Sequence, residues 1–356
     1  MTELDRNRVL VGMSGGVDSS TAVCLLREAG FQVLGATLRL VDGACAGEDS
    51  VRDAAQAAAR LGVPHCVCEG KERFRREVLD YFAASYEAGL TPNPCVRCNR
   101  QVKFPALLEA AEAQGAWYAA TGHYARVERM GDRYLLKKGL DGKKDQSYFL
   151  YALTQAQLAH IRFPLGGLDK QTVREIAQAH GLTNAHKRDS QDICFIPDGD
   201  YAAFLERYTG KRWPEGDFLD TEGNVLGRHE GHIRYTLGQR RGLRIALGQR
   251  TYVVGKDPAA NTVTLGGNEA LFSAHVTVGG LNLLACDELE QPLRLRAKTR
   301  YSQQEAECTV RQTGADRLEV DFDQPQRAVT PGQALVLYDG DTVVAGGTIL
   351  AAKGRQ

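Results

Sequence analysis

The first half of the chain alternates short apolar runs with longer segments in which apolar residues recur at the helical period. The predicted strands are 9–11, 31–40, 63–68 and 117–121, and the predicted helices are 20–29, 51–61, 71–88 and 102–114. Strands that are separated by helices form parallel sheets with helices on both faces. We therefore predict an α/β domain, built on a doubly wound parallel sheet, over residues 1–208.

The hydrophobic pattern changes after about Tyr208. From there on, Gly, Val, Thr and Leu recur in short alternating runs that are typical of half-buried strands. The segment before this change contains a hairpin pattern over 126–137. We predict a small β-rich domain over residues 209–267, followed by a C-terminal β-barrel over 268–356.

Composition places the chain among soluble globular proteins. The 356 residues suffice for two or three domains, and 43% hydrophobic against 25% charged residues leave an ample core. No apolar run approaches the roughly 20 residues of a membrane span, and the first residues have no signal-peptide character. We therefore expect a cytoplasmic protein without a membrane partner. Because 44 basic residues balance 44 acidic ones, RNA binding would require local basic patches.

The most informative motif is VLVGMSGGVDSS at residues 9–20, where an apolar strand runs through paired glycines into a helix. Gly15 and Gly16 can adopt a positive φ, which lets backbone N–H groups converge, and the helix adds its own unpaired N–H groups and dipole. This combination predicts an anion cradle for phosphate or pyrophosphate. The motif is neither a Walker A loop nor a GxGxxG fingerprint. An ordinary strand–turn–helix corner would explain one glycine but not the whole run.

The form SGGxDS resembles the pyrophosphatase loop (PP-loop) of enzymes that split ATP into AMP and pyrophosphate. Ligands of parallel sheets bind beyond the carboxyl ends of the strands, where Leu38 and the segment Thr121–His123 also fall. One ATP could therefore touch all three segments. The predicted ATP contacts are Gly12, Met13, Ser14, Gly15, Gly16, Val17, Asp18, Ser19, Leu38 and Gly122.

Nine cysteines in a chain with this expected location are better interpreted as free thiols, metal ligands or catalysts than as structural disulfides. Cys95 and Cys98 form a CxxC, and the two prolines that precede it predict a loop of fixed shape. A redox pair, half of a metal site and a nucleophile with a neighbour all fit this spacing. Basic residues nearby favour the thiolate, and they are Arg97, Arg100 and Lys103. Cys194, a lone cysteine between apolar residues, fits a buried structural role equally well.

The remaining cysteines have structural interpretations. Cys66 and Cys68 lie two apart on a predicted strand, hence on one face, and we expect them in the core. Cys24 lies beside apolar residues of the first helix and is expected there too. The others carry no motif, and they are Cys45, Cys286 and Cys308.

Motifs from both halves of the chain occur in the order of one known family. They are SGGVDSS, TPNPCVRCN, ATGHYAR, KDQSYFL, DSQDICFIP, TLGQRRGL, RYS and PGQA. The chain resembles the bacterial tRNA-specific 2-thiouridylases (tRNA-uridine 2-sulfurtransferases), which replace oxygen by sulfur at carbon 2 of the wobble uridine, U34. The resemblance implies a PP-loop ATP pyrophosphatase domain of the adenine nucleotide alpha-hydrolase-like class, with ATP and Mg²⁺ as cofactors. It also implies Lys, Glu and Gln tRNAs as substrates, and a sulfur-relay protein or a cysteine desulfurase as sulfur donor.

The implied chemistry suits these residues. A uracil C2 carbonyl has no leaving group, so ATP adenylates its oxygen while the glycine loop and Mg²⁺ neutralise the departing pyrophosphate. By resemblance, Cys194 carries a persulfide and Cys98 is the nucleophile, and the pair ends each cycle as a transient disulfide. Because a disulfide needs Cα atoms roughly 6 Å apart, we expect a loop to move. Some family members carry Asp in place of Cys95. With this thiol, Cys95, Cys98 and Cys194 could instead hold a [4Fe–4S] cluster that carries hydrosulfide, which is the alternative mechanism.

The target base must leave the stack of the anticodon loop to enter a pocket. The resemblance places Asn93, Pro94 and Cys95 against that base. It implies further tRNA contacts at His123, Lys144, Asp145, Gln146, Arg300, Tyr301 and Gln333. Two of these have structural alternatives, since His123 fits a core histidine and Asp145 fits a helix cap. Basic residues of the second half indicate a phosphate-tracking surface, and they are Arg234, Arg240, Arg241, Arg244, Arg250 and Lys298.

Two other function classes share some of these features. An amide-forming synthetase could use the same glycine loop, but it would need an ammonia source, and the chain shows no glutaminase half. A non-catalytic RNA-binding protein would not need an intact SGGVDSS motif together with Cys98 and Cys194.

Overall fold

The computed structural model describes residues 4–41, 48–182, 193–245 and 247–354. These fall into two compact units. Unit 1 comprises Met1–Leu79, Pro94–Gly199 and Gly340–Val344, and unit 2 comprises Asp80–Asn93, Asp200–Asp339 and Ala345–Gln356. This division follows contacts rather than chain order, and the domain boundaries expected after residues 208 and 267 remain a prediction.

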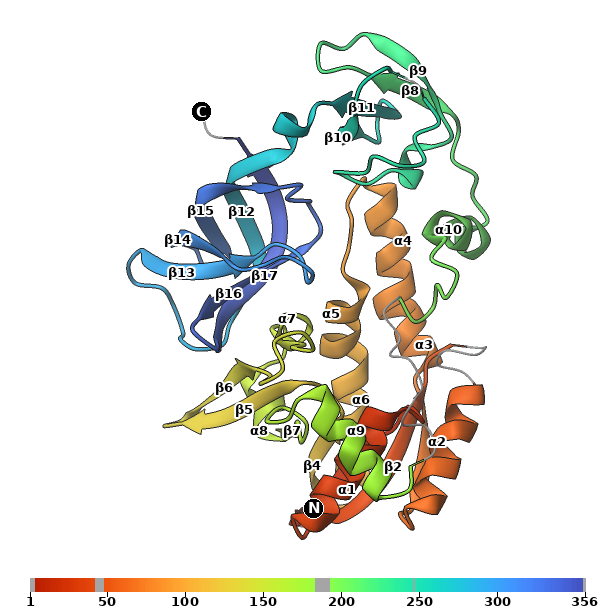
Figure 1. The fold of residues 1–356 in the computed structure, drawn as a ribbon, viewed down its shortest axis with the longest axis vertical. Helices are drawn as coiled ribbons and strands as arrows, with labels where there is room; N and C mark the ends of the chain where they lie inside the picture. The colour runs from red at the N-terminus through yellow and green to blue at the C-terminus, as the bar shows by residue number, and fades with distance from the viewer. Residues whose placement is uncertain (1–3, 42–47, 183–192, 246, 355–356) are drawn as a thin grey trace. The chain divides into compact units, whose positions relative to one another are not determined.

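Unit 1 is built on a five-stranded parallel sheet with the order β3-β2-β1-β4-β7 (Figure 1). The strands are β1 (Asp5–Gly12), β2 (Gln32–Arg39), β3 (His65–Glu69), β4 (Ala116–Thr121) and β7 (Ile161–Arg162). The helices that cover it are α1 (Val17–Glu28), α2 (Glu48–Arg60), α6 (Phe104–Ala113) and α9 (Lys170–Ala179). The predicted alternation of strands and helices is therefore confirmed.

The two faces of this sheet bury separate cores. Val9 and Val11 of β1 pack in one cluster with residues of α1, α2 and α9. Leu10, between them, packs on the opposite face with Leu107 and Ala111 of α6. Because side chains alternate along a strand, an almost continuous apolar strand places residues in both cores. This is the doubly wound arrangement that the sequence predicts.

The segment around the CxxC differs from its prediction. The chain is helical from Pro94 onward, as α5 (Pro94–Cys98), a π-helical turn (Asn99–Lys103) and then α6. The predicted fixed loop is therefore wrong after Asn93. Proline is accepted in the first turn of a helix, where its missing N–H leaves no bond unmade, so Pro94 begins this helix.

A second π-helical turn interrupts the long helix predicted over 71–88. The segment consists of α3 (Lys71–Phe74), the π-helical turn Arg75–Leu79 and α4 (Asp80–Glu87). Such turns are rare, short and frequent at functional sites. One of the two turns directly follows Cys98, and the other includes Glu77, which pairs with Arg97.

The rest of unit 1 is a hairpin with short helices. The hairpin consists of β5 (Ala125–Met130) and β6 (Arg133–Lys138), in agreement with the prediction. It is followed by α7 (Ser147–Leu150) and α8 (Gln155–Ala159). Thr154 and Gln157 form a capping box that begins α8.

Unit 2 contains two helices and a small sheet. Rings of α4 pack against rings of α10 (Tyr201–Thr209), and Tyr86 stacks on Tyr201 with centroids 4.7 Å apart. The sheet has the order β10-β11-β8-β9 and encloses an apolar cluster around Phe218 and Val253. Its strands are β8 (Gly216–Leu219), β9 (Val225–His229), β10 (Tyr252–Asp257) and β11 (Thr262–Gly266), and a 3₁₀ turn (His232–Arg234) lies between β9 and β10.

The C-terminal strands form a closed barrel with the order β12-β15-β14-β13-β16-β17, and pairing of β12 with β17 completes the ring. A 3₁₀ turn (Asn268–Leu271) leads into it. The strands are β12 (Phe272–Leu283), β13 (Leu293–Lys298), β14 (Ala306–Gly314), β15 (Arg317–Arg327), β16 (Ala334–Asp339) and β17 (Thr342–Lys353). Closure removes exposed sheet edges and confirms the predicted barrel.

Candidate active site

The glycine loop between β1 and α1 has one position that accepts only glycine. Gly15 has φ +72°, and a Cβ atom there would lie 2.6 Å from Cβ of Asp53 and 3.0 Å from the backbone nitrogen of Ala54. Gly16 instead has φ −85° and ψ 163°, so its predicted positive φ is wrong. It is the extended N-cap of α1, and its carbonyl accepts hydrogen bonds of 3.1 Å from the hydroxyls of both Ser19 and Ser20. The first N–H groups of α1 therefore lie beside this turn, as an anion cradle would require, and anion binding there remains a prediction.

Hydrogen bonds from β2 hold this loop in place. The Met13 amide donates to the carbonyl of Ala36 at 2.7 Å, and the Thr37 hydroxyl donates to the carbonyl of Met13 at 2.9 Å. Nε2 of His65 lies 2.8 Å from the same hydroxyl. Burial lowers the pKa of His65, so a neutral ring fits this contact. Neither Thr37 nor His65 could be predicted from the sequence, because nothing local marks a side chain that bonds a strand carbonyl.

Asp18 of the glycine loop is held by two residues that were not predicted. Nζ of the buried Lys170 lies 2.8 Å from each of its carboxylate oxygens, and the Tyr124 hydroxyl donates to Oδ1 at 2.9 Å. Lys170 begins α9, whose N-cap is Asp169. No local pattern marks Lys170 as the partner of Asp18, since the two residues lie 152 positions apart.

The end of β4 approaches the same turn. A Cβ atom on Gly122 would lie 2.8 Å from the backbone of Asp18 and of Ser19, so only glycine permits this approach. Leu38 pairs with Cys68 near the carboxyl ends of β2 and β3. The structure therefore brings Gly122 to the glycine loop and places Leu38 at the same edge of the sheet, while ATP contacts at these positions remain predictions.

The two cysteines of α5 lie in different environments. Cys95 is exposed, whereas Cys98 is buried. Burial raises the pKa of Cys98 to about 11, although the charge of Lys103 acts in the opposite direction. The expectation that basic neighbours favour the thiolate is therefore wrong for the resting protein, because desolvation outweighs them. Arg97 instead pairs with Glu77, bonding its carbonyl at 3.0 Å and its carboxylate at 3.1 Å.

Cys194 lies half-buried in a turn, and the segment around it packs on the helical stretch that Arg97 also contacts. The Phe195 ring meets the Phe74 ring edge-on at 5.7 Å between centroids. Glu77, the partner of Arg97, follows Phe74 by three positions. The segments of Cys98 and Cys194 therefore both pack on Lys71–Leu79, although they are far apart in sequence. Asp189, Gln191 and Asp192 of the DSQDICFIP motif lie outside the described residues.

The three thiols do not form a ligand set for a metal. Among the described residues, which include Cys95, Cys98 and Cys194, no group of three Cys, His, Asp or Glu side chains is placed to hold a metal ion. A [4Fe–4S] cluster does not fit this arrangement. Mg²⁺ needs fewer protein ligands than such a cluster, since it is usually held by one or two carboxylates together with substrate phosphates. Asp18 is a carboxylate in the cradle that could serve this purpose.

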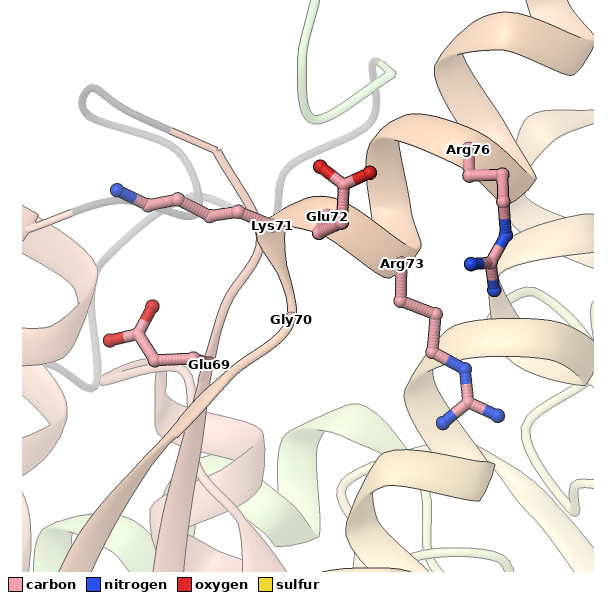
Figure 2. A pocket seen from close by; sticks show the side chains of 6 residues that line it. All are labelled: Glu69, Gly70, Lys71, Glu72, Arg73 and Arg76. Carbon is pink, nitrogen blue, oxygen red and sulfur yellow. The ribbon is translucent and has the colours of Figure 1, made fainter.

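A cavity of about 610 Å³ opens at the carboxyl end of β3 (Figure 2). It is lined by Glu69, Gly70, Lys71, Glu72, Arg73 and Arg76. The charges of two of these side chains are balanced by ion pairs, since Glu69 pairs with Arg39 and Arg73 pairs with Glu109, each at 2.8 Å. No predicted site residue lines the cavity.

Comparison with known proteins decides between the function classes. Residues 7–198 match a family described as the tRNA methyl transferase HUP domain, 202–267 the tRNA methyl transferase PRC-barrel domain, and 273–349 the aminomethyltransferase beta-barrel domain. A tRNA-specific 2-thiouridylase MnmA from Lachnoclostridium phytofermentans is 47% identical over 354 residues, which cover 96% of this chain and 99% of that protein. The chain belongs to the tRNA-specific 2-thiouridylase family. A relative of the same name from Acetivibrio thermocellus is 47% identical over 358 residues, covering 97% of this chain and 100% of that protein.

Solved structures match more weakly. A 4-thiouridine synthetase–RNA complex with bound ATP has 17% identity and a TM-score of 0.34, covering 57% of this chain and 50% of that chain. An NMN synthetase from Francisella tularensis has 18% identity and a TM-score of 0.34, covering 58% of this chain and 77% of that chain. These scores are too low to support an argument, so membership of the thiouridylase family rests on the sequence relatives.

Two of the tRNA contacts expected in this family also have structural roles. The His123 ring lies 5.8 Å from Phe104 and 5.9 Å from Phe163, and its Nδ1 lies 2.7 Å from the Thr121 hydroxyl. Burial, aided by the charge of Lys103, holds the pKa of His123 well below its usual value, so the ring is neutral. The ring packs between two aromatic side chains, but the residue is half-buried rather than part of the core.

The turn Lys144–Gln146 is fixed from inside unit 1. The buried Asp145 carboxylate accepts from the backbone of Ser147 at 3.1 Å and of Gly139 at 3.0 Å. The N-cap of α7 is Gln146, so the expectation that Asp145 is the cap is wrong by one position, although its carboxylate does bond the first N–H of the helix. Gln146 exchanges hydrogen bonds with the backbone of Tyr124. Roles of these residues toward tRNA remain predictions.

The other residues that are expected to contact tRNA lie in unit 2. They are Gln333, the pair Arg300 and Tyr301, and the basic residues of the predicted phosphate-tracking surface. Gln333 donates through Nε2 to the carbonyl of Thr91 at 3.1 Å, two positions before Asn93. Arg300 donates to the carbonyl of Arg327 at 2.7 Å, and the neighbouring Tyr301 is exposed. Among the expected phosphate-tracking residues, Arg234 pairs with Glu206 and Arg244 with Glu230, Lys298 lies over the Tyr338 ring, and Arg240, Arg241 and Arg250 are exposed.

The other cysteines agree with their structural interpretations. Cys24 is buried, and Cys66 and Cys68 pack partly buried against the core of α6. Burial raises the pKa of Cys68 to about 11. Cys308 is buried and Cys286 half-buried, while Cys45 lies outside the described residues. Within the described residues, no helix combines the length and apolar character needed to cross a bilayer.

Proposed function

We propose that this chain is an ATP-dependent tRNA-uridine 2-sulfurtransferase that converts the wobble uridine of tRNA to 2-thiouridine. The observation that supports the proposal is that unit 1 combines groups suited to both steps of the reaction. This unit holds a glycine-rich anion cradle together with two cysteine segments that pack on one helical stretch, Lys71–Leu79. Membership of the thiouridylase family over nearly the whole chain supports it.

The first step is adenylation of the uridine. The C2 oxygen attacks the α-phosphate of ATP, the α–β phosphoanhydride bond breaks, and pyrophosphate leaves. The N–H groups at the start of α1 bind the departing anion, and the Lys170 ammonium adds positive charge beside Asp18. Mg²⁺, held by the phosphates and by Asp18, would neutralise further charge on the leaving group.

The second step is sulfur transfer. A donor protein, either a sulfur-relay protein or a cysteine desulfurase, loads Cys194 as a persulfide. The Cys98 thiolate attacks Sγ of Cys194, the persulfide S–S bond breaks, and the outer sulfur leaves as hydrosulfide with the bonding electron pair. Hydrosulfide attacks C2 of the adenylated uridine and AMP leaves. The Cys98–Cys194 disulfide is then reduced by a dithiol reductant.

Sulfur transfer brings the two cysteines together. Because a disulfide needs Cα atoms roughly 6 Å apart, we expect α5 or the turn that carries Cys194 to move before the two sulfurs meet. The target base would lie against Asn93, Pro94 and the exposed Cys95. The persulfide route is preferred over the cluster route because the described thiols do not form a metal-ligand set.

A reconstituted reaction tests the proposal. The protein is incubated with tRNA, ATP, Mg²⁺ and a persulfide donor, and 2-thiouridine is measured by mass spectrometry of the nucleosides. Cys98→Ser and Cys194→Ser should each abolish the product, whereas Cys286→Ser, which alters a thiol outside the site, should retain it. Pyrophosphate release without thiolation of any tRNA would instead indicate another adenylating reaction.

An iron and sulfide assay of anaerobically purified protein separates the two sulfur routes. Full persulfide-dependent turnover by iron-free protein supports the persulfide route. Cys95→Asp sharpens this test, because the change removes one of the three thiols that a cluster would need. Retained activity supports the persulfide route, and activity that requires iron and is lost with Cys95→Asp overturns it.

A further inference from the structure

The Asp18 carboxylate of the glycine loop is bound to an ammonium group of the same unit. Nζ of Lys170 lies 2.8 Å from Oδ1 and 2.8 Å from Oδ2, and the Tyr124 hydroxyl donates to Oδ1 at 2.9 Å. A carboxylate has about four acceptor sites, so these contacts occupy most of them. The ion pair is largely removed from water, since the Lys170 side chain is 8% exposed and that of Asp18 is 28% exposed.

This ion pair joins the starts of two helices. Asp18 lies in the first turn of α1, and Lys170 is the first residue of α9. The two helices pack together, because Cys24 of α1 shares an apolar cluster with Ala177 of α9. The N–H of Lys170 also donates to Oδ2 of Asp141 at 3.1 Å. The backbone of Lys170 is therefore fixed beside the glycine loop, while its four-carbon side chain can reorient.

Helix stability does not explain a lysine at this position. The N-terminal end of a helix dipole is positive and disfavours a cation in the first turn. Replacing both partners of a buried ion pair by apolar residues often leaves stability unchanged or raises it, so the fold alone does not require the pair. A cation at the start of α9, beside the glycine loop, therefore suits an anionic ligand better than it suits the helix.

Mg²⁺ and the Lys170 ammonium would compete for the same carboxylate. Mg²⁺ binds a carboxylate oxygen at about 2.0–2.1 Å, whereas the ammonium lies 2.8 Å from each oxygen of Asp18. Two cations on one carboxylate repel each other strongly where water screens them little. The phosphates of ATP relieve this repulsion, because they supply oxygen ligands for Mg²⁺ and a new anionic partner for the ammonium.

We propose that Lys170 holds the cation position at Asp18 until ATP binds and then becomes a phosphate-binding residue, so that the loop takes a metal only together with ATP. The proposal rests on the proposed ATP-binding role of the glycine loop. When ATP and Mg²⁺ bind, Asp18 exchanges the ammonium for the metal, and the ammonium turns to the phosphates. There it stabilises the pyrophosphate that leaves during adenylation.

Metal binding in the absence of nucleotide tests the first half of this exchange. Full-length protein without tRNA is titrated with MnCl₂, and free Mn²⁺ is measured by electron paramagnetic resonance. Lys170→Met frees the Asp18 carboxylate and should bind Mn²⁺ about tenfold more tightly than wild type. Adding Asp18→Asn should abolish this gain, which locates the metal at Asp18. Lys170→Arg keeps the ion pair and should behave like wild type.

ATP binding tests the second half and should change in the opposite direction. The affinity for ATP is measured by isothermal titration calorimetry in excess Mg²⁺. Lys170→Met should bind ATP about tenfold more weakly, because the contact between ammonium and phosphate is lost. Arg174→Met removes an exposed positive charge from the same helix and should change neither affinity. A merely structural role of Lys170 would lower both affinities or neither.

The proposal requires both changes at once, and any other combination overturns it. Circular dichroism checks that each variant is folded, and Lys170→Gln takes the place of Lys170→Met if the latter is not. Micromolar binding of Mn²⁺ by wild type, lost in Asp18→Asn, would overturn the proposal without any Lys170 variant.

Failure of the proposed function would look different. Both affinities are measured without tRNA, so they do not depend on sulfur transfer. Absence of 2-thiouridine from the reconstituted reaction would refute the proposed function, and the Mn²⁺ and ATP affinities would still decide the role of Lys170. Conversely, thiolation by a protein whose Lys170→Met variant has unchanged affinities would support the function and remove this role of Lys170.

Discussion

The glycine loop and the cysteine helix lie in the same unit, yet their polar groups are used differently. In the loop, the serine hydroxyls, the Met13 carbonyl and the Asp18 carboxylate all have partners before ATP arrives. In the cysteine helix, Cys98 is buried with a raised pKa, and within the described residues Oδ1 of Asn99 is buried without a hydrogen-bond partner. The loop that is expected to bind phosphate is preorganised, whereas Cys98, the expected nucleophile, is held as a buried thiol with a raised pKa. This difference suits a cycle in which adenylation precedes sulfur transfer.

The largest expected effect tests the preorganised side of this comparison. Gly15→Ala places a Cβ atom 2.6 Å from Asp53 and requires a strained positive φ. We expect pyrophosphate release to fall at least about a hundredfold, since the strain of about 1–3 kcal/mol adds to the clash. Gly142→Ala, at a glycine with open space around it, is the matched control. The alkylation rate of Cys98 should not change, and a parallel loss there would show that the two regions are not independent.

Lys170→Met tests whether the ion pair holds the loop. The change leaves the Asp18 carboxylate without its ammonium partner, and we expect the free energy of unfolding to fall by about 3 kcal/mol in urea titrations. Lys143→Met, at an exposed lysine, should change it little. Adding Asp18→Asn to the Lys170 variant should recover part of the loss. No recovery would mean that Lys170 acts through packing rather than charge.

The raised pKa of Cys98 predicts a pH dependence of stability. The native pKa of about 11 exceeds the usual value of about 8.5, so folding favours the protonated thiol. This contribution is complete below pH 8.5 and is lost as the pH rises toward 11. Between pH 8 and pH 10.5, urea titrations should show wild type losing on the order of 2 kcal/mol more than Cys98→Ser. Cys286→Ser should follow wild type, and equal slopes for all three proteins would contradict burial of Cys98.

The smallest effect concerns the connection between the cysteine segments. Glu77→Gln weakens the contact between Arg97, next to Cys98, and the helical stretch on which Phe195 packs. We expect single-turnover sulfur transfer to slow about tenfold, equivalent to about 1.4 kcal/mol, while pyrophosphate release stays unchanged. Glu72→Gln removes an exposed ion pair with Arg75 on the same stretch and is the control. Equal slowing by both variants would indicate a general effect on the helix.

Local patterns along the chain were enough to predict the sheet, the barrel, the glycine loop and the family. The alternation of apolar strands and amphipathic helices is a local pattern with a local cause, because side chains of a strand or a helix repeat at a set period. Gly15 could be recognised for the same reason, since SGGxDS is contiguous in the chain. The start of a helix at Pro94 also follows a local rule, because proline is favoured in the first turn of a helix as well as in loops.

The groups that surround the reactive atoms come together through long-range packing, which no local pattern predicts. Lys170 reaches Asp18 across 152 positions, and Arg97 reaches Glu77 across 20, so no local pattern could announce either pair. The state of Cys98 was misjudged for the same reason. Its basic neighbours are visible in sequence, but the desolvation that outweighs them comes from elements packed around α5. Burial is a property of the assembled fold, and it sets the charge of a thiol more strongly than adjacent residues do.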